Sequence, residues 1–377
     1  MPGSGEINPA RLRESLDSLA GIEELRRAAG DERAYLVGGA VRDLLLGRKR
    51  TDLDLAVDGD VGAIARALGE DVTTHERFGT AMVRVGDLVV DLARSRAESY
   101  ERPGALPAVT PAPIAEDLAR RDFTINAMAV PLTGRAELID PYGGLEDLRA
   151  GVLRVLHERS FVDDPTRALR AARYAARFHF GLEPGTEKLL RAADLSTVSD
   201  DRIQAELRRI AAEEDPAGVL ALILEWGVMP SLDSGAPERV GAVADLASRP
   251  PWAGWAEREL AVTLAIVRPL PQIRELATAT PERPSEVVRL AEPWDPAQLL
   301  VARALGAEWL DRYAEELRHA GLEITGDDLI REGVPEGPAI GRGLEAALSG
   351  KLDGELSGRD EELRIALAAA RGEIPED

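Results

Sequence analysis

Apolar residues follow two different periods along this chain, and the change falls near residue 160. Before it, short apolar runs and alternating polar positions predict strands; after it, apolar positions three and four apart predict helices. The predicted strands are residues 34–37, 51–57, 81–85, 88–93 and 125–130. The predicted helices are 166–178, 202–213, 216–226, 258–267, 296–318, 340–349 and 359–371, with proline-rich breaks at 249–251, 269–271 and 280–284. The pattern predicts an αβ head joined to a long, all-helical remainder.

Turn residues indicate how the head is connected. Gly38 and Gly39 separate the first strand from an amphipathic helix at 41–46, and Gly86-Asp87 marks a hairpin between two neighbouring strands. A small, mostly antiparallel sheet with flanking helices is therefore expected. The proline-rich segment 100–115 is expected to be a loop over the sheet, without regular structure.

Composition narrows the class of protein. With 377 residues, 45% of them hydrophobic and 30% charged, the chain suits two or three globular domains. No run of eighteen uncharged apolar residues occurs, and residues 1–20 contain charges throughout, so we expect neither a membrane span nor a secretory signal. The absence of cysteine excludes disulfides and thiolate metal sites, and the four His have no metal spacing. A cytoplasmic location is expected.

The net charge of −21 argues against a nucleic-acid partner when it is taken as an average. The charge is segregated, however. Residues 165–180 carry four arginines and no acid, whereas residues 321–377 carry fourteen acids and six bases. The arginine cluster therefore remains a candidate site for phosphate or RNA.

Two aspartates provide the first candidate for chemistry. Asp52 and Asp54 lie two apart in an alternating strand, so their side chains point to one face, where two carboxylates can hold divalent cations. Two-metal phosphoryl transfer requires that arrangement. An Asp-x-Asp alone is more typical of a solvated strand face, and the upstream Gly-Gly turn with Arg42 is by itself more typical of an ordinary strand-to-helix turn. The combination of the two is far more specific.

The blocks in this region resemble a known family. Residues 36–57 (LVGGAVRDLLLGRKRTDLDLAV) resemble the signature of the class II tRNA nucleotidyltransferases, the CCA-adding enzymes, and of their bacterial poly(A) polymerase relatives. Further blocks match in the same order at 117–130, 140–156 and 161–178, and more weakly at 201–210 and 323–348. The resemblance implies an α+β fold, in which a polymerase-beta-like nucleotidyltransferase head with a small mixed sheet is followed by an all-helical neck, body and tail.

The resemblance also implies domain boundaries and roles. Residues 1–155 would form the nucleotidyltransferase head, 156–215 a helical neck that recognises the nucleotide base, and 216–377 a helical body and tail that bind tRNA. Residues 215–320 contain little recognisable motif, and their apolar helix faces suit a dimer interface and a tRNA surface equally. A monomer and a homodimer both remain open.

Site residues carry over from the matching blocks. The resemblance implies that Gly39 and Arg42 contact the incoming triphosphate, that Asp52 and Asp54 hold Mg²⁺, and that Arg121 contacts the nucleotide. Arg120 and Asp122 flank Arg121 and would support it, and Asn126 would position the sugar. Asp91 stands where a third carboxylate of this superfamily falls, and whether it is catalytic remains open.

The block DDPTRALRAAR adds a chemical argument. On a helix Arg167, Arg170, Arg173 and Arg177 fall within about 120°, which makes one cationic stripe for a triphosphate or an RNA strand. Asp164 places an acceptor beside the donors of Arg167, which matches the amino group and ring nitrogen shared by cytosine and adenine. Uracil and guanine would present a carbonyl to the carboxylate. An ordinary salt-bridged helix is the alternative.

One position departs from the family pattern. Asp163 stands where the family usually has Glu, and we expect it to act as an N-cap for the helix that follows Pro165. The second acid, Asp164, matches the family and is the one assigned to base reading.

Together these observations predict a template-independent RNA nucleotidyltransferase. It would add C and A from CTP and ATP to the 3′ end of tRNA, release pyrophosphate and use Mg²⁺, without a membrane partner. A poly(A) polymerase, a CC-only enzyme and an A-only enzyme remain alternatives, because the head motifs do not separate them. A catalytically silent RNA-binding paralogue is a further alternative of another class.

Overall fold

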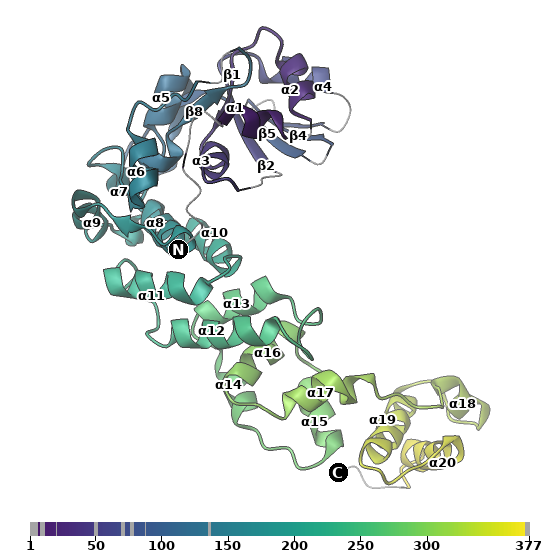
Figure 1. The fold of residues 1–377 in the computed structure, drawn as a ribbon. Helices are drawn as coiled ribbons and strands as arrows, with labels where there is room; N and C mark the ends of the chain where they lie inside the picture. Colours follow the sequence, from purple (N-terminus) through teal and green to yellow (C-terminus); the bar gives the residue numbers. More distant parts are fainter. Residues whose placement is uncertain are drawn as a thin grey trace. The chain divides into compact units, whose positions relative to one another are not determined.

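The protein is described from a computed structural model that covers residues 7, 12–19, 21–48, 52–68, 72–75, 79–86, 88–134 and 137–373, with only the backbone for 72–75. It divides into two compact units (Figure 1). The first comprises Met1–Glu206 and Ala221–Pro230, and the second comprises Leu207–Leu220 and Ser231–Asp377. The boundary passes through two helices, α10 (Asp200–Ala211) and α11 (Pro216–Trp226). The predicted change from strands to helices near residue 160 therefore falls inside the first unit.

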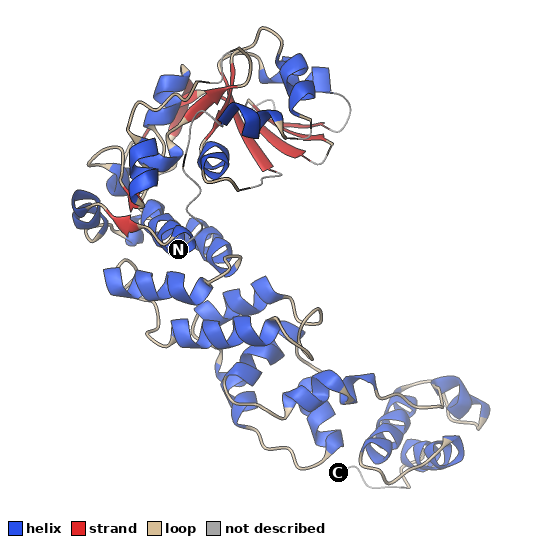
Figure 2. Ribbon diagram, in the orientation of Figure 1, coloured by secondary structure: helices blue, strands red, loops and turns tan. Residues whose placement is uncertain are grey.

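A six-stranded sheet forms the centre of the first unit (Figure 2). Its order is β3-β4-β5-β2-β1-β8, and only the β2–β5 pair is parallel. The strands are β1 (Ala34–Val37), β2 (Asp52–Val57), β3 (Val72–His75), β4 (Thr80–Val85), β5 (Leu88–Arg94) and β8 (Ala129–Pro131). This confirms the small mixed sheet, and the antiparallel pairing of Val85 with Leu88 confirms the β4–β5 hairpin.

The two faces of the sheet have different surroundings. On β2, Leu53 and Leu55 are buried, while Asp52 and Asp54 point to the other face and are exposed. The helices α2 (Ile22–Ala29) and α4 (Val61–Leu68) lie on the leucine side (Figure 1). On the aspartate side, α5 (Ile114–Ala119) packs Leu118 against Ala56, two residues beyond Asp54. Because α5 covers only that end of β2, the two aspartates stay accessible.

Two sequence predictions for the head need correction. Residues 125–130 are not one strand, because the 3-10 turn η3 (Thr124–Asn126) precedes the short strand β8. The proline-rich segment is also not entirely irregular: β7 (Ala108–Pro111) pairs with β6 (Arg96–Ser99) in a separate two-stranded ribbon, and α5 begins at Ile114. An edge ribbon accepts proline because its outer N–H groups need no partner strand.

Further helices complete the first unit. They are α1 (Leu12–Asp17), α3 (Gly39–Leu45), α6 (Gly144–Ala150), α7 (Ser160–Asp163), α8 (Thr166–Phe178) and α9 (Pro184–Leu190), and the short strands β9 (Val152–Leu153) and β10 (Gly181–Leu182) pair in parallel. The predicted bounds of α8 are confirmed. Tyr174 on α8 packs against Phe123, with their ring centroids 5.8 Å apart. The ring of Phe123 also lies 6.5 Å from that of Phe161 on α7. This aromatic contact fixes α8 against the segment that carries Arg121 and Asp122.

The second unit contains helices and no strand among its described residues. Beyond α10 and α11, its helices are α12 (Ala236–Ala247), α13 (Arg258–Ile266), α14 (Pro271–Thr278), α15 (Pro284–Ala291), α16 (Pro296–Ala304), α17 (Leu310–Glu315), η5 (Leu317–His319), α18 (Gly326–Arg331), α19 (Pro338–Leu352) and α20 (Arg359–Ala370). The predicted helix 296–318 is two helices, because the chain turns at Gly306, where φ is +125°. The sequence prediction missed α12, α14, α15 and α18.

The last helices of the second unit form a small core of their own. Leu329, Ala347 and Ala366 are buried there, and a Cβ added to Gly343 would lie 2.5 Å from the carbonyl oxygen of Ala366. Gly343 therefore allows α19 and α20 to approach closely. No helix in the part of the chain that the structure describes is both long enough and apolar enough to cross a membrane.

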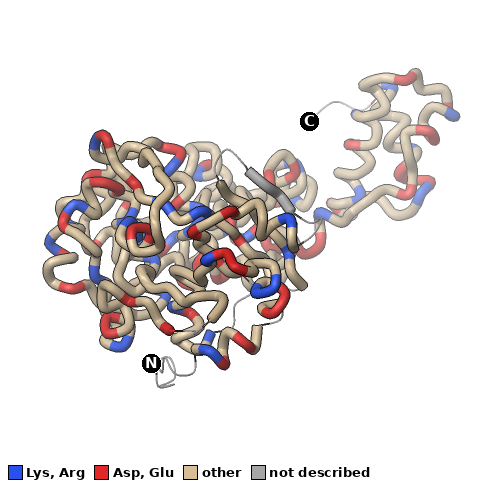
Figure 3. Tube along the Cα trace, turned by 90° about the horizontal axis from the view of Figure 1, so that it is seen from above, with Lys and Arg blue, Asp and Glu red and all other residues tan. Residues whose placement is uncertain are grey.

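Acidic and basic positions are interspersed along the trace of both units (Figure 3). Many of the arginines have a carboxylate partner, as the site below illustrates. The large negative net charge therefore says little about the local charge around any one arginine.

Candidate active site

The turn between β1 and α3 places backbone close to an arginine. Gly38 adopts φ +65°, which side chains rarely adopt, and a Cβ at this position would lie 2.5 Å from Nη1 of Arg121. The N–H of Gly38 donates to the carbonyl of Met128 at 3.2 Å. Glycine at 38 therefore lets Arg121 reach the turn that Gly39 continues. Gly39, a predicted triphosphate contact, and Arg121, the predicted nucleotide contact, thus lie near each other.

Arg42, on α3, is buried with only 2% of its surface exposed. Its Nε donates to Asp43 at 2.9 Å and its Nη1 donates to Asn126 at 2.5 Å. The guanidinium also lies over the rings of Phe178 at 4.6 Å and Tyr174 at 5.4 Å. Arg42 thus connects the phosphate-side helix to α8, and Asn126 is its direct partner.

Asp52 and Asp54 share the open face of the sheet with a third carboxylate. Asp91 on β5 lies directly opposite Asp54 in the parallel pair, so all three side chains point the same way. Burial raises the pKa of Asp91, and the negative charges of Asp54 and Asp52 raise it further. Among the described residues neither Asp52 nor Asp54 forms an ion pair.

This charge cluster fits a divalent cation. Carboxylates are the ligands that Mg²⁺ prefers, and a cation would relieve the repulsion that the pKa of Asp91 reports. No group of three or more such side chains within the described ranges already stands at coordinating geometry. Asp52 and Asp54 therefore remain the predicted metal ligands, and the position of Asp91 keeps it a candidate for a third.

A buried aspartate organises the two arginines that follow α5. Asp117 is 1% exposed and receives Arg121 Nη2 on Oδ2 at 2.8 Å and Arg120 Nη2 on Oδ1 at 2.8 Å. Burial alone would raise the pKa of Asp117, but the Arg121 and Arg120 guanidiniums hold it below its usual value. Arg120 also donates to Glu98 at 2.8 Å. Arg121 is thereby aimed at the Gly38 turn, which supports the predicted supporting role of Arg120.

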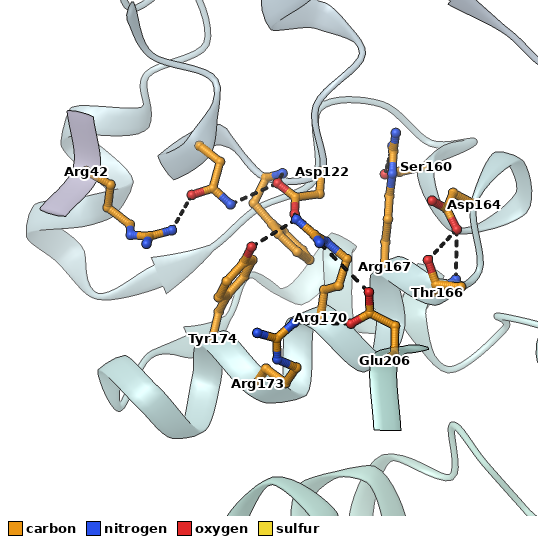
Figure 4. Close-up of polar contacts among 12 residues, drawn as sticks. Arg42, Asp122, Ser160, Asp164, Thr166, Arg167, Arg170, Arg173, Tyr174 and Glu206 are labelled. Carbon is orange, nitrogen blue, oxygen red and sulfur yellow. Dashed lines mark hydrogen bonds and ion pairs between the residues drawn. The ribbon is translucent and has the colours of Figure 1, made fainter. Parts of the chain in front are cut away.

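Asp122 connects the head to α8 (Figure 4). Its Oδ2 receives Nε and Nη2 of Arg170 at 2.8 and 2.7 Å, and its Oδ1 receives Nδ2 of Asn126 at 2.9 Å. Although burial opposes ionisation, Arg170 and Asn126 lower the pKa of Asp122 to about 2. The charge of Asp122 raises the pKa of Arg170 in return. Asp122 was predicted to support Arg121, and the structure shows that its own partners are Asn126 and Arg170 on α8.

Glu206 on α10 continues this network. It is 3% exposed, receives Arg173 Nη1 at 3.1 Å, and lies 3.9 Å from Arg170 Nη1 (Figure 4). The motif analysis did not single out Glu206, although the block DRIQAELRRI contains it four residues after Arg202. The spacing of four residues places Arg202 and Glu206 on the same face of the helix, and this was the sequence signal that could have identified Glu206.

The predicted base reader, Asp164, lies at the turn between α7 and α8. Its Oδ1 receives the N–H of Thr166 at 3.0 Å, the hydroxyl of Thr166 at 2.6 Å and Nη2 of Arg202 at 2.7 Å. Arg167 is 5% exposed, and it donates to the hydroxyl of Ser160 and to the carbonyl of Arg120, both at 2.7 Å. The N–H of Arg167 donates to the carbonyl of Asp164 at 3.1 Å, so the two residues are neighbours at the start of α8, and each side chain has hydrogen-bond partners. Figure 4 shows Asp164 with its partner Thr166.

Two expectations about this helix differ from the structure. Arg167, Arg170 and Arg173 do lie on one side of α8, but that side faces the interior, where Ser160, Asp122 and Glu206 are their partners. Only Arg177, at the far end, is exposed, so α8 does not present an open cationic stripe. Asp163 ends α7 and receives Arg159 at 2.9 Å, so it does not cap α8; the carboxylate of Asp164 receives the Thr166 amide instead.

Comparison with known proteins shows which family this chain resembles. Residues 34–154 match the family model described as the poly A polymerase head domain. A CC-adding tRNA nucleotidyltransferase of Deinococcus radiodurans is 36% identical over 381 residues, which cover 93% of this chain and 92% of that protein. The chain belongs to the tRNA nucleotidyltransferase family. The resemblance on which the site residues were carried over is therefore confirmed.

Other members of the family bear different names. An A-adding tRNA nucleotidyltransferase of Geobacter sulfurreducens is 33% identical over 89% of this chain. The matches span only 26% to 49% of the length of the A-adding relatives, so this chain corresponds to less than half of those proteins. The family thus includes members named for at least two different specificities at similar identity.

Solved structures of the family share the fold along most of the chain. The complex of a CCA-adding enzyme with ATP superposes with a TM-score of 0.76 at 29% identity, covering 95% of this chain and 97% of that one. The Thermotoga maritima CCA-adding enzyme in complex with tRNA superposes with a TM-score of 0.70 at 29% identity, covering 95% and 98%. The polymerase-beta-like head followed by a helical remainder is therefore confirmed.

Proposed function

We propose that this chain is a template-independent RNA nucleotidyltransferase that adds C and A, from CTP and ATP, to the 3′ end of tRNA. The observation that carries the proposal is the state of Asp164. All three hydrogen bonds of its carboxylate within the described structure reach Oδ1, so Oδ2 remains an available acceptor near Arg167. The side chain of Asp164 is 19% exposed, which leaves that oxygen within reach of a base.

A fixed carboxylate oxygen next to a fixed guanidinium selects bases by their edges. Cytosine and adenine place an amino donor beside a ring-nitrogen acceptor, which complements Oδ2 of Asp164 and an N–H of Arg167. Uracil and guanine would place a carbonyl oxygen against Oδ2, and two acceptors left facing each other in a partly buried site cost free energy. The protein itself therefore replaces a template strand.

The remaining site residues suit the triphosphate. The reaction joins the 3′ oxygen of the RNA to the α-phosphorus of the nucleotide and releases pyrophosphate. Asp52 and Asp54 would hold Mg²⁺, which supplies positive charge to the oxygens that gain charge in phosphoryl transfer. Gly39, Arg42 and Arg121 line the turn where the phosphates would lie. Catalysis of this type is mainly positioning and electrostatic stabilisation.

The arginines on α8 supply the connection between base and phosphate. Arg170 and Arg173 already have Asp122 and Glu206 as partners, so their positions are fixed before a nucleotide binds. We assign them to nucleotide binding because they extend from the base reader Arg167 toward Arg42 along one side of α8. Residues 1–155 would thus be the catalytic head, and 156–215 the base-recognising neck.

The helical residues 216–377 would bind the tRNA. The Thermotoga maritima relative, which shares the fold along 95% of this chain, has been solved with a tRNA. Helical surfaces can read an RNA helix by its shape and backbone. A tRNA substrate would place the activity in the cytoplasm.

CC addition alone is the second candidate, because the Deinococcus radiodurans relative of that name is 36% identical along nearly the whole of both chains. The A-adding relatives favour a third possibility less, since their matches span less than half of their length. The described head residues do not distinguish among these specificities.

One experiment separates them. The purified chain is given labelled CTP and ATP, each alone and together, with three tRNA transcripts that end before CCA, after C and after CC. The proposal expects CMP on the first two transcripts, AMP on the third, and then a stop. CMP addition alone would establish the CC-adding candidate, AMP addition only to the CC end the A-adding one, and an unlimited ATP ladder a poly(A) polymerase.

A silent variant makes the experiment interpretable. Asp54→Asn should incorporate nothing on any transcript, which shows that label in the wild-type lanes comes from this site. No product from the wild-type chain, together with retained tRNA binding, would contradict the proposed activity and favour an RNA-binding role.

A further inference from the structure

Arg202 contacts two parts of the first unit that are far apart in sequence. From α10, its Nη2 donates to Oδ1 of Asp164 at 2.7 Å and its Nη1 donates to the carbonyl of Gly104 at 3.0 Å. Its side chain is 22% exposed. One guanidinium therefore connects the proposed base reader with the tip of the β6–β7 ribbon.

The other bonds of Asp164 are local and cannot replace this contact. Thr166, two residues away, donates its N–H and its hydroxyl to the same Oδ1. These bonds shape the turn itself, so they move with Asp164. Arg202 comes from another helix and holds the carboxylate relative to the rest of the unit. A charge-assisted bond of this kind is also the stronger type.

The second partner of Arg202 is itself held closely. Gly104 adopts φ +68°, and a Cβ there would lie 2.5 Å from both the carbonyl oxygen and Oγ1 of Thr197. Its N–H donates to the carbonyl of Val162 at 3.3 Å. Only glycine fits this position, so the segment 100–107 is held against the turn that precedes α8.

We propose that Arg202 is a positioning residue for base selection, which holds Oδ1 of Asp164 so that Oδ2 faces the nucleobase, and that the segment 100–107 sets the position of Arg202 through the carbonyl of Gly104. This inference rests on the proposed function of Asp164. Arg202 itself contacts no base. It acts by preventing the carboxylate from rotating or shifting when a mismatched edge, such as that of uracil, approaches.

The consequence is a specific pattern of selectivity. Without Arg202, Asp164 retains only its local bonds, and a small shift lets the carboxylate avoid the carbonyl of uracil. Loss of one hydrogen bond to a charged group corresponds to about tenfold to hundredfold. The ratio of kcat/KM for UTP to that for CTP should therefore rise by about tenfold or more in Arg202→Ala.

The experiment measures that ratio with the full chain and a tRNA transcript ending before CCA. Arg202→Lys keeps the charge but cannot hold two acceptors in a fork, so it should show a smaller rise. Gly104→Ala keeps the Arg202–Asp164 pair but displaces the carbonyl, and it should also raise the ratio. Thermal unfolding of each variant identifies any loss of folded protein, which would lower both rates together and leave the ratio unchanged.

Matched controls are present in the same unit. Arg191 donates to the carboxylate of Glu187 at 2.7 Å and to the carbonyl of Glu225 at 3.5 Å, the same kinds of partner, but on an exposed surface. Arg191→Ala should leave the ratio at the wild-type value. Gly227 has φ +71° and nothing within 4 Å of an added Cβ, so Gly227→Ala controls for backbone strain.

The failures are distinguishable. A wild-type chain that adds no nucleotide contradicts the proposed function. Wild-type addition with an unchanged UTP-to-CTP ratio in Arg202→Ala overturns only the role of Arg202. A raised ratio in Arg202→Ala with the wild-type ratio in Gly104→Ala overturns the part assigned to the segment 100–107.

Discussion

Asp122 and Arg170 form a two-point ion pair across 48 residues, in which Nε and Nη2 of the guanidinium meet the single oxygen Oδ2 at 2.8 and 2.7 Å. The remaining oxygen of Asp122 holds Asn126, which in turn receives Arg42. The residue next to Arg121 thus fixes both α3 and α8. The proposed nucleotide site is organised around this carboxylate, although Asp122 itself is buried.

The Asp122–Arg170 pair predicts a pH dependence of stability. The pKa of Asp122 is about 2 in the folded protein against 3.8 for an ordinary aspartate, so the ionised form is favoured by folding. Its contribution, about 2 kcal/mol, is fully present above pH 4 and is lost as the pH falls toward 2. The free energy of unfolding of Asp122→Asn should therefore lie below that of the wild type by about this amount at pH 6, and the gap should narrow below pH 4.

Denaturant titrations at several pH values would measure the gap. Glu116→Gln, a change of an exposed acid on α5, serves as the control and should leave the free energy nearly unchanged. A gap for Asp122→Asn that stays constant from pH 6 to pH 3 would show that the carboxyl charge is not the source.

Asp52→Asn and Asp54→Asn each remove one predicted metal ligand from an exposed strand face. We expect incorporation to fall by about 10³-fold or more, since metal-assisted charge stabilisation amounts to several kcal/mol. Folding and tRNA binding should persist, because neither side chain is buried. Single-turnover incorporation and a filter-binding assay measure the two properties, with the exposed Asp60→Asn as control. Near-native turnover in either variant would refute the metal assignment.

Gly38→Ala tests the turn beside Arg121. An added Cβ would lie 2.5 Å from Nη1 of Arg121, and φ is +65°. At Gly47, φ is +69° but nothing lies within 4 Å of an added Cβ. Both substitutions should lower stability by about 1 kcal/mol through backbone strain. Only Gly38→Ala should also raise the KM for CTP, by about tenfold, because it displaces a group that bonds to a charged ligand.

Steady-state kinetics and thermal unfolding of both variants give the answer. Equal KM values for CTP in Gly38→Ala and Gly47→Ala would mean that the place of Arg121 beside the turn has no role in nucleotide binding.

A buried glutamate stabilises the last helices. Glu362 is fully buried, receives Nζ of Lys351 at 2.7 Å on one oxygen and the N–H of Glu323 at 2.7 Å on the other. Burial would raise the pKa of Glu362, but Lys351 keeps it below its usual value. Glu362→Gln should destabilise this region by about 2 kcal/mol. Hydrogen exchange of the Glu323 amide should accelerate accordingly, whereas the exposed Glu345→Gln should leave it unchanged.

The sequence predicted the parts of the fold that depend on local pattern. Ala34–Val37 has the predicted bounds because its apolar run ends at the Gly38-Gly39 turn, and Thr166–Phe178 because it follows Pro165 with a helical apolar period. The predicted strand at 125–130 was wrong. Asn126 binds Asp122 and Arg42 there, and these tertiary contacts override the strand propensity of the segment. The helix α12 was missed because its alanines and valines carry little contrast between faces.

The candidate site was predictable in its residues but not in its pairings. The motif blocks named Asp122, Arg170 and Asp164, yet nothing in a linear sequence says which acid meets which arginine. Glu206 and Arg202 were overlooked because they stand in a weak block on a helix, and their significance comes from contacts 33 and 38 residues away. The expected open arginine stripe was wrong for the same reason, since its acidic partners lie on other elements.

The strand order of the head also has a consequence for how the head folds while the ribosome synthesises it. The neighbour of β1 on one side, β2, follows it closely, but its neighbour on the other side is β8, with Tyr35 opposite Pro131. The N–H of Gly38, in the turn after β1, donates to the carbonyl of Met128, just before β8. A nascent chain must therefore keep an unfinished sheet edge exposed while roughly a hundred residues are synthesised, about 5 to 20 seconds at ordinary elongation rates. Chaperone demand should be greatest in that interval.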